Sequence, residues 1–513
     1  MNGNFTFLDY AVFVTYAIVI LGVGLFVSRD KKGHEKTAED YFLAGKTLPW
    51  WAIGASLIAA NISAEQFIGM SGSGFAVGLA IASYEWMAAI TLLIVAKYFL
   101  PIFIKQELFT IPEFIEKRFN TTLKTILAVF WIALFVLVNL TTVLFLGSLA
   151  LDTILGSGDG SNLMYYAIGL ALFAAAYSVW GGLSAVAWTD VIQVVLLVVG
   201  GLITTIIALN NVTPDGGTLN GLSHLFDVAG DKFHMILKKD NPEFKNLPGI
   251  AVLIGGMWVA NLYYWGFNQY IIQRALAAKS LKEAQRGLAF AGFLKLVVPL
   301  IIVIPGIIAF VMFKENIQGA GAVFSDALGA SNDHAYPWLI GKFIPAGIKG
   351  LVVAALSAAI VSSLASMLNS VSTIFTMDIY KPYLNKDAGN KQLVRTGRIT
   401  VLVALVIAIF LVKPMESLGQ IFQVIQEYTG IVSPGILAVF LMGLFWKKTN
   451  VKGAIIGVLS SIPIALALKF LPIEMPFLDQ MFYTLIITVT IIMGVSLTTG
   501  EGDDEAKGIP LDK

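Results

Sequence analysis

The sequence predicts an all-α membrane protein of about thirteen transmembrane helices, arranged as an inverted repeat of five plus five helices. Of its 513 residues, 57% are hydrophobic and only 13% are charged, and the mean hydropathy is +0.79. Soluble proteins carry about 25% charged residues. Long apolar runs alternate with short charged stretches, and two of these runs are interrupted by polar residues and glycines. The solvent for most of the surface is therefore lipid.

A helix needs about 20 mostly apolar residues to cross the bilayer. By that criterion the chain contains about thirteen spans. They are 9–28, 49–75, 77–104, 121–150, 162–180, 183–209, 248–275, 283–315, 346–376, 395–413, 418–446, 452–471 and 479–498.

Basic residues occur in alternate short loops, those after spans one, three, seven, nine and eleven. Arg274 and Lys124, for example, are expected in such loops. Cytoplasmic loops are enriched in Lys and Arg, so the N-terminus is expected outside and the C-terminus in the cytoplasm, across the cell (inner) membrane. A net charge of +1 gives no indication of nucleic-acid binding, and the absence of cysteine excludes disulfides and Cys-based metal sites.

Polar side chains lie at membrane depth in several spans. The stretch ASLIAANISAEQFIGM, 55–70, places Asn61, Ser63, Glu65 and Gln66 within six positions. A charged residue at the bilayer centre costs about 2.5–3.5 kcal/mol and usually has a function. The other spans with polar residues carry Glu85, Asn261, Lys295, Ser362, Ser363 and Gln426. A buried Glu85–Lys295 ion pair that serves only packing is the alternative interpretation.

Spans two to six and spans seven to eleven form two sets of opposite orientation, and each set opens with its most polar, glycine-interrupted helix. Corresponding broken helices in inverted repeats indicate a midplane binding site of a secondary transporter. The expected organisation is an extra helix and loop (1–48), a first repeat (49–209), an outer loop (210–247), a second repeat (248–446), additional helices (447–498) and a cytoplasmic tail (499–513).

The cavity chemistry favours sodium and a neutral polyol. Unwound carbonyls near Ala59 and Ile62 offer oxygen ligands, and Ser362 and Ser363 are about 100° apart on a helix. Amide and charged side chains can hydrogen-bond to the hydroxyl groups of a polyol, and aromatic rings can cover its C–H face. The aromatic residues could equally belong to the hydrophobic core. An anionic substrate would need an unpaired arginine, and none is expected in mid-span.

Several long motifs resemble the sodium/solute symporter family, and within it the sugar-transporting branch. They include ASLIAANISAEQFIGMSGSG, SYEWM, WVANLYYWGFNQYIIQR, ALSAAIVSSLASMLNS and IQEYTGIVSPGILAVFLMGLFWKK. The resemblance covers about 9–498. It implies two inverted five-helix repeats like those of the leucine transporter, with alternating access.

The resemblance also implies the roles of individual residues. Sodium, the co-transported ion, would bind the backbone oxygens of Ala59, Ile62 and Ala359 and the hydroxyls of Ser362 and Ser363, with Asp190 on its exit path. The sugar would be held by Gln66, Glu85, Asn261, Lys295 and Gln426. Tyr264 would stack on the ring as the inner gate, with Asn61 bonded to it and Trp265 beside it; Met70, Tyr84 and Phe422 would form the outer lid.

One departure concerns substrate contact. Ala88 stands where a galactose-transporting member has a serine that touches the sugar. A lost neutral hydrogen bond is worth about 0.5–1.5 kcal/mol, which is enough to shift selectivity.

The expected function is inward sodium-coupled uptake of galactose or glucose. Symport of inositol, sialic acid, proline or pantothenate and a non-transporting sensor remain alternatives. An enzyme is not expected, because the spans contain no catalytic motif. The sequence leaves the preferred sugar, the sodium stoichiometry and the oligomeric state open.

Overall fold

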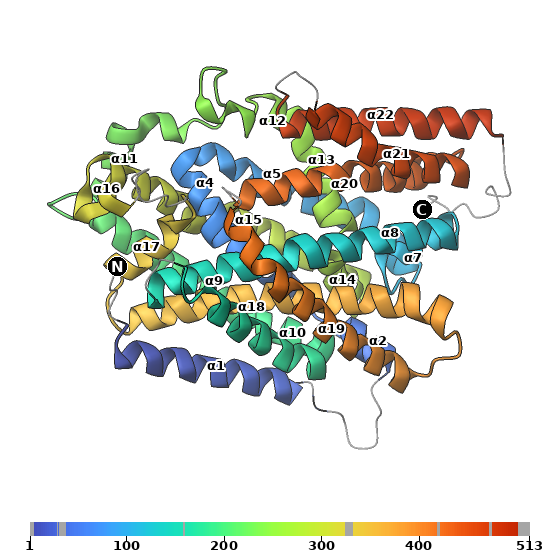
Figure 1. Ribbon diagram of the computed structural model, residues 1–513, viewed down its shortest axis with the longest axis horizontal. Helices are drawn as coiled ribbons and strands as arrows, with labels where there is room; N and C mark the ends of the chain where they lie inside the picture. Colours follow the sequence, from blue (N-terminus) through green and yellow to red (C-terminus); the bar gives the residue numbers. More distant parts are fainter. Residues whose placement is uncertain are drawn as a thin grey trace.

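The long helices of the computed structural model run side by side along the long axis of the molecule (Figure 1). The structure describes residues 5–27, 29, 37–156, 160–323, 332–417, 421–470 and 475–500. Within these ranges the regular structure is helical, apart from one isolated bridge between Leu48 and Ala278. Ten helices in the described ranges are long and apolar enough to cross a membrane. The predicted all-α membrane fold is confirmed.

The predicted spans outside this group of ten are 49–75, 162–180 and 248–275. The first and third are broken into short helices, and the apolar part of the second, Leu163–Ala176, is shorter than a full span.

The helices up to the outer loop are α1 (Phe7–Val27), α2 (Ala38–Leu43), α3 (Trp50–Asn61), η2 (Glu65–Met70), α4 (Ser71–Ala76), η3 (Leu79–Ala82), α5 (Ser83–Ile94), η4 (Val95–Phe99), α6 (Leu100–Lys105), α7 (Ile111–Arg118), α8 (Thr121–Ala133), η5 (Leu134–Leu140), α9 (Thr141–Leu155) and α10 (Leu163–Asn210).

The later helices begin with α11 in the outer loop. They are α11 (Thr218–Ala229), α12 (Ala251–Ile254), α13 (Gly256–Leu262), η8 (Tyr263–Phe267), α14 (Gln269–Leu276), α15 (Leu281–Lys314), α16 (Ala320–Val323), α17 (Ala335–Phe343), α18 (Ile348–Ile374), η12 (Phe375–Leu384), α19 (Asn390–Val412), α20 (Ile421–Phe445), α21 (Val451–Phe470) and α22 (Phe477–Thr498). In Figure 1, α21 and α22 lie together at the edge opposite α1.

The first broken helix is interrupted where its polar residues begin. Ile62 leaves the helical region with φ −76° and ψ 85°. The Ser63 N–H bonds to the Asn61 carbonyl at 2.9 Å and to Gln66 Oε1 at 3.2 Å. The polar side chain therefore satisfies backbone that has left the α-helical ladder, which is tolerated at this depth only inside protein or beside a cavity. The helix resumes as the π-helical turn η2.

The second break lies in the corresponding helix of the later half. The π-helical segment η8 follows α13, and Asn268 then takes an extended conformation with φ −87° and ψ 121° before α14 begins. Interruptions are therefore present in both spans, 49–75 and 248–275, in which polar residues and glycines predicted them. The repeat boundaries themselves remain predictions.

Gly182 divides α10 into the two segments that correspond to spans five and six. Its φ of +60° and ψ of −155° suit glycine alone, and a Cβ there would lie 2.3 Å from the Tyr41 carbonyl oxygen. We expect Gly182→Ala to lower the unfolding temperature clearly, because the clash adds to a backbone conformational cost of about 1–3 kcal/mol. Thermal unfolding in detergent measures this. Gly169→Ala, which meets nothing within 4 Å in the same helix, is the matched control.

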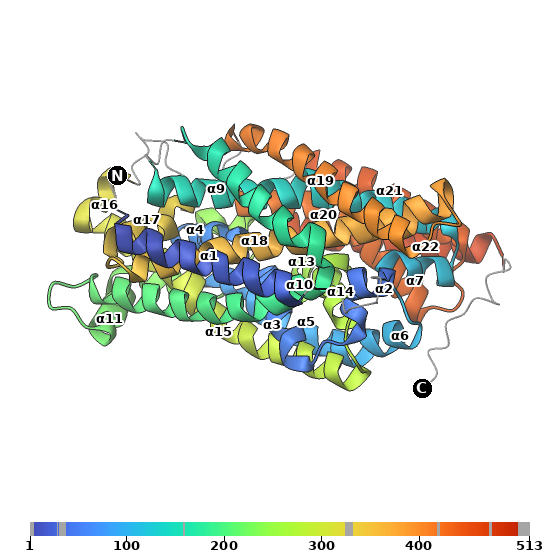
Figure 2. The ribbon, with the colours of Figure 1, turned by 90° about the horizontal axis from the view of Figure 1, so that it is seen from below.

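The first helix is bonded to the start of α18. The Asp9 carboxylate is fully buried and accepts hydrogen bonds from the N–H groups of Gly347 at 2.7 Å and Gly350 at 2.8 Å. These N–H groups have no partner within their own helix, so the carboxylate caps α18 from another segment. Figure 2 shows α1 lying along α18 and α10.

Two basic residues expected in cytoplasmic loops are instead buried. Arg274 is 1% exposed, and Lys124 is 4% exposed and pairs with Glu116 at 2.5 Å. The loop interpretation was wrong for both, because a charge at the end of an apolar run can turn inward when a partner is available. Residues 30–36 after the first span, and residues 501–513 of the predicted tail, lie outside the described residues.

Candidate functional site

One cavity lies between the two broken helices and collects the residues that were predicted separately for the sugar and for the gates. Its wall includes residues of α3, η2, α5, η5, α13, η8, α15, α20 and α22. We call it the central cavity. The predicted residues that line it are Asn61, Gln66, Met70, Tyr84, Glu85, Ala88, Asn261, Tyr264, Trp265, Lys295, Phe422 and Gln426.

Lys295 is the centre of a buried charge network in this cavity. Its ammonium group donates to the Glu85 carboxylate and to the Asn61 amide oxygen. Both charged side chains are at most 4% exposed. The ammonium also lies 5.1 Å from the ring centroid of Trp265, within the range of a cation–π contact. The network holds a donor and an acceptor at fixed positions beside an aromatic wall.

Two amides complete the polar wall near the helix breaks. The Gln66 Oε1 accepts from the Ser63 hydroxyl at 3.1 Å, and the Asn261 amide donates to the Met257 carbonyl at 3.1 Å. Gln66 keeps its amide donors and Asn261 its amide oxygen for other partners. Gln426 reaches the same cavity from α20, whereas Ala88 presents only a methyl group.

The residues predicted to form the two gates are in contact with one another. The Asn61 amide donates to the Tyr264 hydroxyl at 2.9 Å, and Tyr264 is also bonded to Tyr270. The rings of Tyr84 and Phe422 meet edge to face with centroids 5.5 Å apart. Each pair joins side chains from different helices, and the gate roles remain predictions.

The cavity also contains residues that the sequence did not assign to it. Glu65 and Asn268 lie in the polar stretches of the two broken helices, so their neighbours were a usable signal. Nothing in the local sequence pointed to several further lining residues. Among these are Asn139, Thr429 and Met481.

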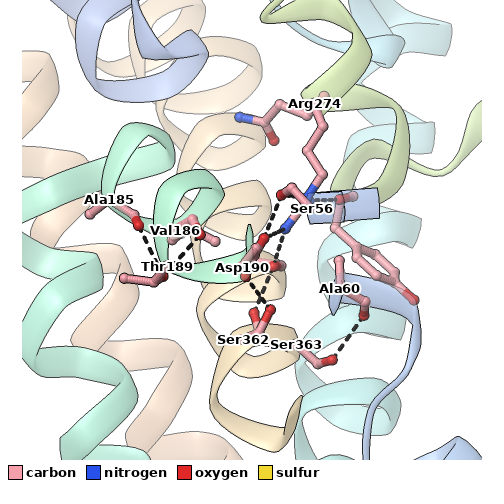
Figure 3. Close-up of polar contacts among 12 residues, drawn as sticks. Ser56, Ala60, Ala185, Val186, Thr189, Asp190, Arg274, Ser362 and Ser363 are labelled. Carbon is pink, nitrogen blue, oxygen red and sulfur yellow. Dashed lines mark hydrogen bonds and ion pairs between the residues drawn. The ribbon is translucent and has the colours of Figure 1, made fainter. Parts of the chain in front are cut away.

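The predicted sodium residues lie at the end of α3 and on the facing part of α18. Figure 3 shows Ser362 and Ser363 of this set. Ser362 and Ser363 are fully buried, as are Ala59, Ile62 and Ala359. The Ser363 hydroxyl donates to the Ala60 carbonyl at 2.8 Å, which joins α18 to the unwinding end of α3. The set offers only neutral oxygen atoms, which suits a monovalent hard cation.

Asp190, predicted on the exit path of the ion, is in direct contact with this set. Its carboxylate accepts hydrogen bonds from the hydroxyls of Ser362 and Ser56 (Figure 3). The Arg274 guanidinium lies 3.5 Å from the same carboxylate. Asp190 is fully buried, so its charge acts on the neighbouring hydroxyls with little screening by water.

Arg274 is the next-to-last residue of the predicted span 248–275, and it is buried inside the bundle, whereas no arginine was expected in mid-span. It bonds to Ser56, Ser366 and the Tyr270 carbonyl as well as to Asp190. Because its charge is paired with Asp190 and the residue does not line the central cavity, it is no binding group for an anionic substrate there. The central cavity therefore still suits a neutral substrate better than an anionic one.

The short helix η11 (Asn332–His334), directly before α17, packs against α4 and contacts the start of α20. Asp333 is 2% exposed, and one carboxylate oxygen accepts from the Ile421 N–H at 3.4 Å. A Cβ on Gly72 would lie 2.6 Å from the other oxygen. Burial raises the pKa of Asp333 to about 7, against the opposing effect of the Ile421 hydrogen bond. This carboxyl thus lies between α4 and the start of α20.

Comparisons with known proteins agree with this architecture. The sodium:solute symporter family model matches residues 41–460. A sodium/glucose cotransporter of Vibrio parahaemolyticus is 63% identical over the whole chain and 94% of its own length. The human sodium/myo-inositol cotransporter 2 is 34% identical over 89% of this chain and 69% of its own.

A solved structure extends the likeness to three dimensions. It is a substrate-bound, outward-open Na+-coupled sialic acid symporter, 25% identical, with a TM-score of 0.82 over 96% of this chain and 98% of that one. The family match covers more than half of the chain, and the close relative spans all of it. This chain belongs to the sodium:solute symporter family.

Proposed function

We propose that this symporter couples inward sodium movement to uptake of a monosaccharide, galactose or glucose. The observation that carries the proposal is the central cavity, where five polar side chains converge beside Tyr264 and Trp265. They are Gln66, Glu85, Asn261, Lys295 and Gln426. Mixed donors and acceptors with an aromatic wall suit a neutral, hydroxyl-rich ring. The cotransporter named for glucose, at 63% identity, supports the same substrate class.

Each polar group has a proposed part in binding. Glu85 accepts from sugar hydroxyls, Lys295 donates to them, and the amides do both. Tyr264 stacks on the ring and closes the inner side with Asn61. Ala88 removes one hydroxyl contact, which shifts the selectivity between sugars without preventing binding.

Sodium binds between α3 and α18 in this proposal. The carbonyls of Ala59, Ile62 and Ala359 and the hydroxyls of Ser362 and Ser363 surround the ion, and Asp190 attracts it towards the inner side. The ion joins the broken helix to α18, so it favours the conformation that also holds sugar. Coupling requires only this shared preference.

The proposed orientation follows from the distribution of basic loops. The N-terminus lies outside and the C-terminus in the cytoplasm of the cell (inner) membrane. Sodium and sugar therefore enter from the side of the loop 210–247. Release is inward, with sodium leaving before Tyr264 moves and the sugar follows.

The test is uptake of labelled galactose into proteoliposomes, with an inward sodium gradient or with potassium in its place. Sodium-driven accumulation that unlabelled glucose inhibits supports the proposal. Uptake that only proline or sialic acid inhibits would overturn the sugar assignment while leaving the family intact.

myo-Inositol is the second candidate substrate. It is a cyclic polyol with the same hydroxyl chemistry, and the 34% identity to a human myo-inositol cotransporter favours including it. The same assay separates the two, because an inositol transporter accumulates labelled myo-inositol at a lower concentration than galactose.

Ser363→Ala is expected to raise the sodium concentration for half-maximal uptake at least tenfold. The variant loses one proposed ion ligand, while the lost hydrogen bond to Ala60 lowers stability by only about 0.5–1.5 kcal/mol. Ser370→Ala is the control, because this hydroxyl lies on the same helix but bonds to Gln273 at 3.0 Å. Equal sodium dependence in both variants would remove Ser363 from the ion site.

A further inference from the structure

A second cavity lies beside the central one, and the two share Met481. This outer cavity has a volume of about 320 Å³. Its wall comes from α20, α21 and α22 and from the end of the loop 210–247. The start of α22 and this loop are on the same predicted outer side. The outer cavity therefore adjoins the sugar site from the side on which substrate arrives.

Neighbouring residues of α20 serve the two cavities. Gln426 lines the central cavity and Glu427 lines the outer one. The Glu427 carboxylate accepts a bond from Lys469 at 3.2 Å, and both side chains are about a third exposed. A carboxylate and an ammonium group on one partly open wall repeat the pairing of Glu85 with Lys295.

The remaining wall mixes amide and aromatic groups. Asn246 and Gln480 contribute amides, and Phe477 contributes a ring. Small-molecule sites typically combine apolar and aromatic surface with a few polar groups that set orientation. The outer cavity has this composition on a surface that no predicted site residue occupies.

Met481 separates the two cavities. It lines both, and a Cβ on Gly430 would lie only 3.0 Å from its Cγ and Sδ atoms. The missing side chain at Gly430 leaves room for the methionine. Methionine is unbranched and adapts its shape readily. A change of its side-chain rotamer would therefore change the barrier between the two cavities.

We propose that the outer cavity is a binding subsite that holds the polyhydroxylated substrate before it passes Met481 into the central cavity. This inference rests on the proposed function and adds a second binding position to it. It also gives α21 and α22, which lie outside the predicted repeats, a direct part in substrate handling. Glu427 and Lys469 supply the hydroxyl contacts, and Phe477 covers the C–H face.

The absence of cysteine in the chain makes a labelling test direct. Gln480→Cys places one thiol in the outer cavity, and Leu219→Cys, at a position 80% exposed on α11, is the control for an outside thiol. A membrane-impermeant maleimide is applied to proteoliposomes with or without galactose. We expect galactose to slow labelling of Gln480→Cys at least threefold and to leave Leu219→Cys unchanged.

The decisive comparison adds Gln66→Ala, which impairs the central cavity. Protection by galactose is expected to persist in the Gln66→Ala/Gln480→Cys protein and to disappear when Lys469→Met is added instead. Protection that disappears with Gln66→Ala, that survives Lys469→Met, or that never occurs would overturn the subsite. Sodium-driven uptake by the unlabelled Gln480→Cys protein is measured separately, so failure of transport is distinguished from failure of the subsite.

Discussion

Lys295→Met is expected to reduce sodium-driven sugar uptake to background, a loss of at least 100-fold. The substitution keeps the apolar length of the side chain but removes the ammonium group that bonds to Glu85 and Asn61. It leaves the Glu85 carboxylate buried without its counter-charge, which costs about 3–5 kcal/mol when a buried pair is broken. Uptake in proteoliposomes and thermal unfolding in detergent measure the two effects.

A double variant separates binding from packing. Lys295→Met/Glu85→Gln has no unpaired charge, so we expect its stability to return towards that of the parent while uptake stays absent. Lys314→Met, at the exposed end of the same helix, is the control for loss of a lysine. Recovery of both stability and uptake in the double variant would mean that the ion pair serves only packing.

Asp190→Asn is expected to weaken sodium dependence more than any other single change near the ion site. The amide keeps the shape of the side chain but loses the charge that faces Ser362 and Arg274. We expect sodium-driven uptake to fall at least 100-fold and the unfolding temperature to drop, because Arg274 becomes an unpaired buried charge. Uptake as a function of sodium concentration measures the first effect.

Neutralising Arg274 as well distinguishes an electrostatic role from a structural one. Asp190→Asn/Arg274→Gln removes both charges and is expected to regain stability but not sodium affinity. The adjacent Thr189 is the matched control, because within the described part of the chain its hydroxyl bonds only to the Ala185 and Val186 carbonyls of its own helix (Figure 3). A double variant with normal sodium affinity would show that Asp190 acts solely as the partner of Arg274.

The parts of the fold that could be predicted are those with a local physical signal. Polar residues and glycines inside an apolar run, as in 55–70, are unfavourable in lipid unless the helix breaks around a cavity. Each of the two broken helices could therefore be predicted from the residues of its own span. The family motifs then assigned roles to individual residues, and the central cavity gathers the side chains assigned to the sugar and the gates.

The missed features depend on partners far away in the sequence. Arg274 follows an apolar run, so it looked like a loop residue, and its pairing with Asp190 depends on contacts between distant helices. Met481 is an ordinary apolar residue in a helix outside the predicted repeats. The sequence around it gives no indication of a cavity. Local patterns therefore located the breaks, while the ion pair and the outer wall required the three-dimensional packing.

The hydrogen bonds from α18 to Asp9 have a consequence for observing the transport cycle. They bond α1 to the same helix that carries Ser362 and Ser363. We expect α1 to move together with α18, although α1 lies at the edge of the bundle. A spectroscopic probe on its lipid-exposed face, for example at Ile18, would then report displacements of the ion-binding helix without touching either substrate.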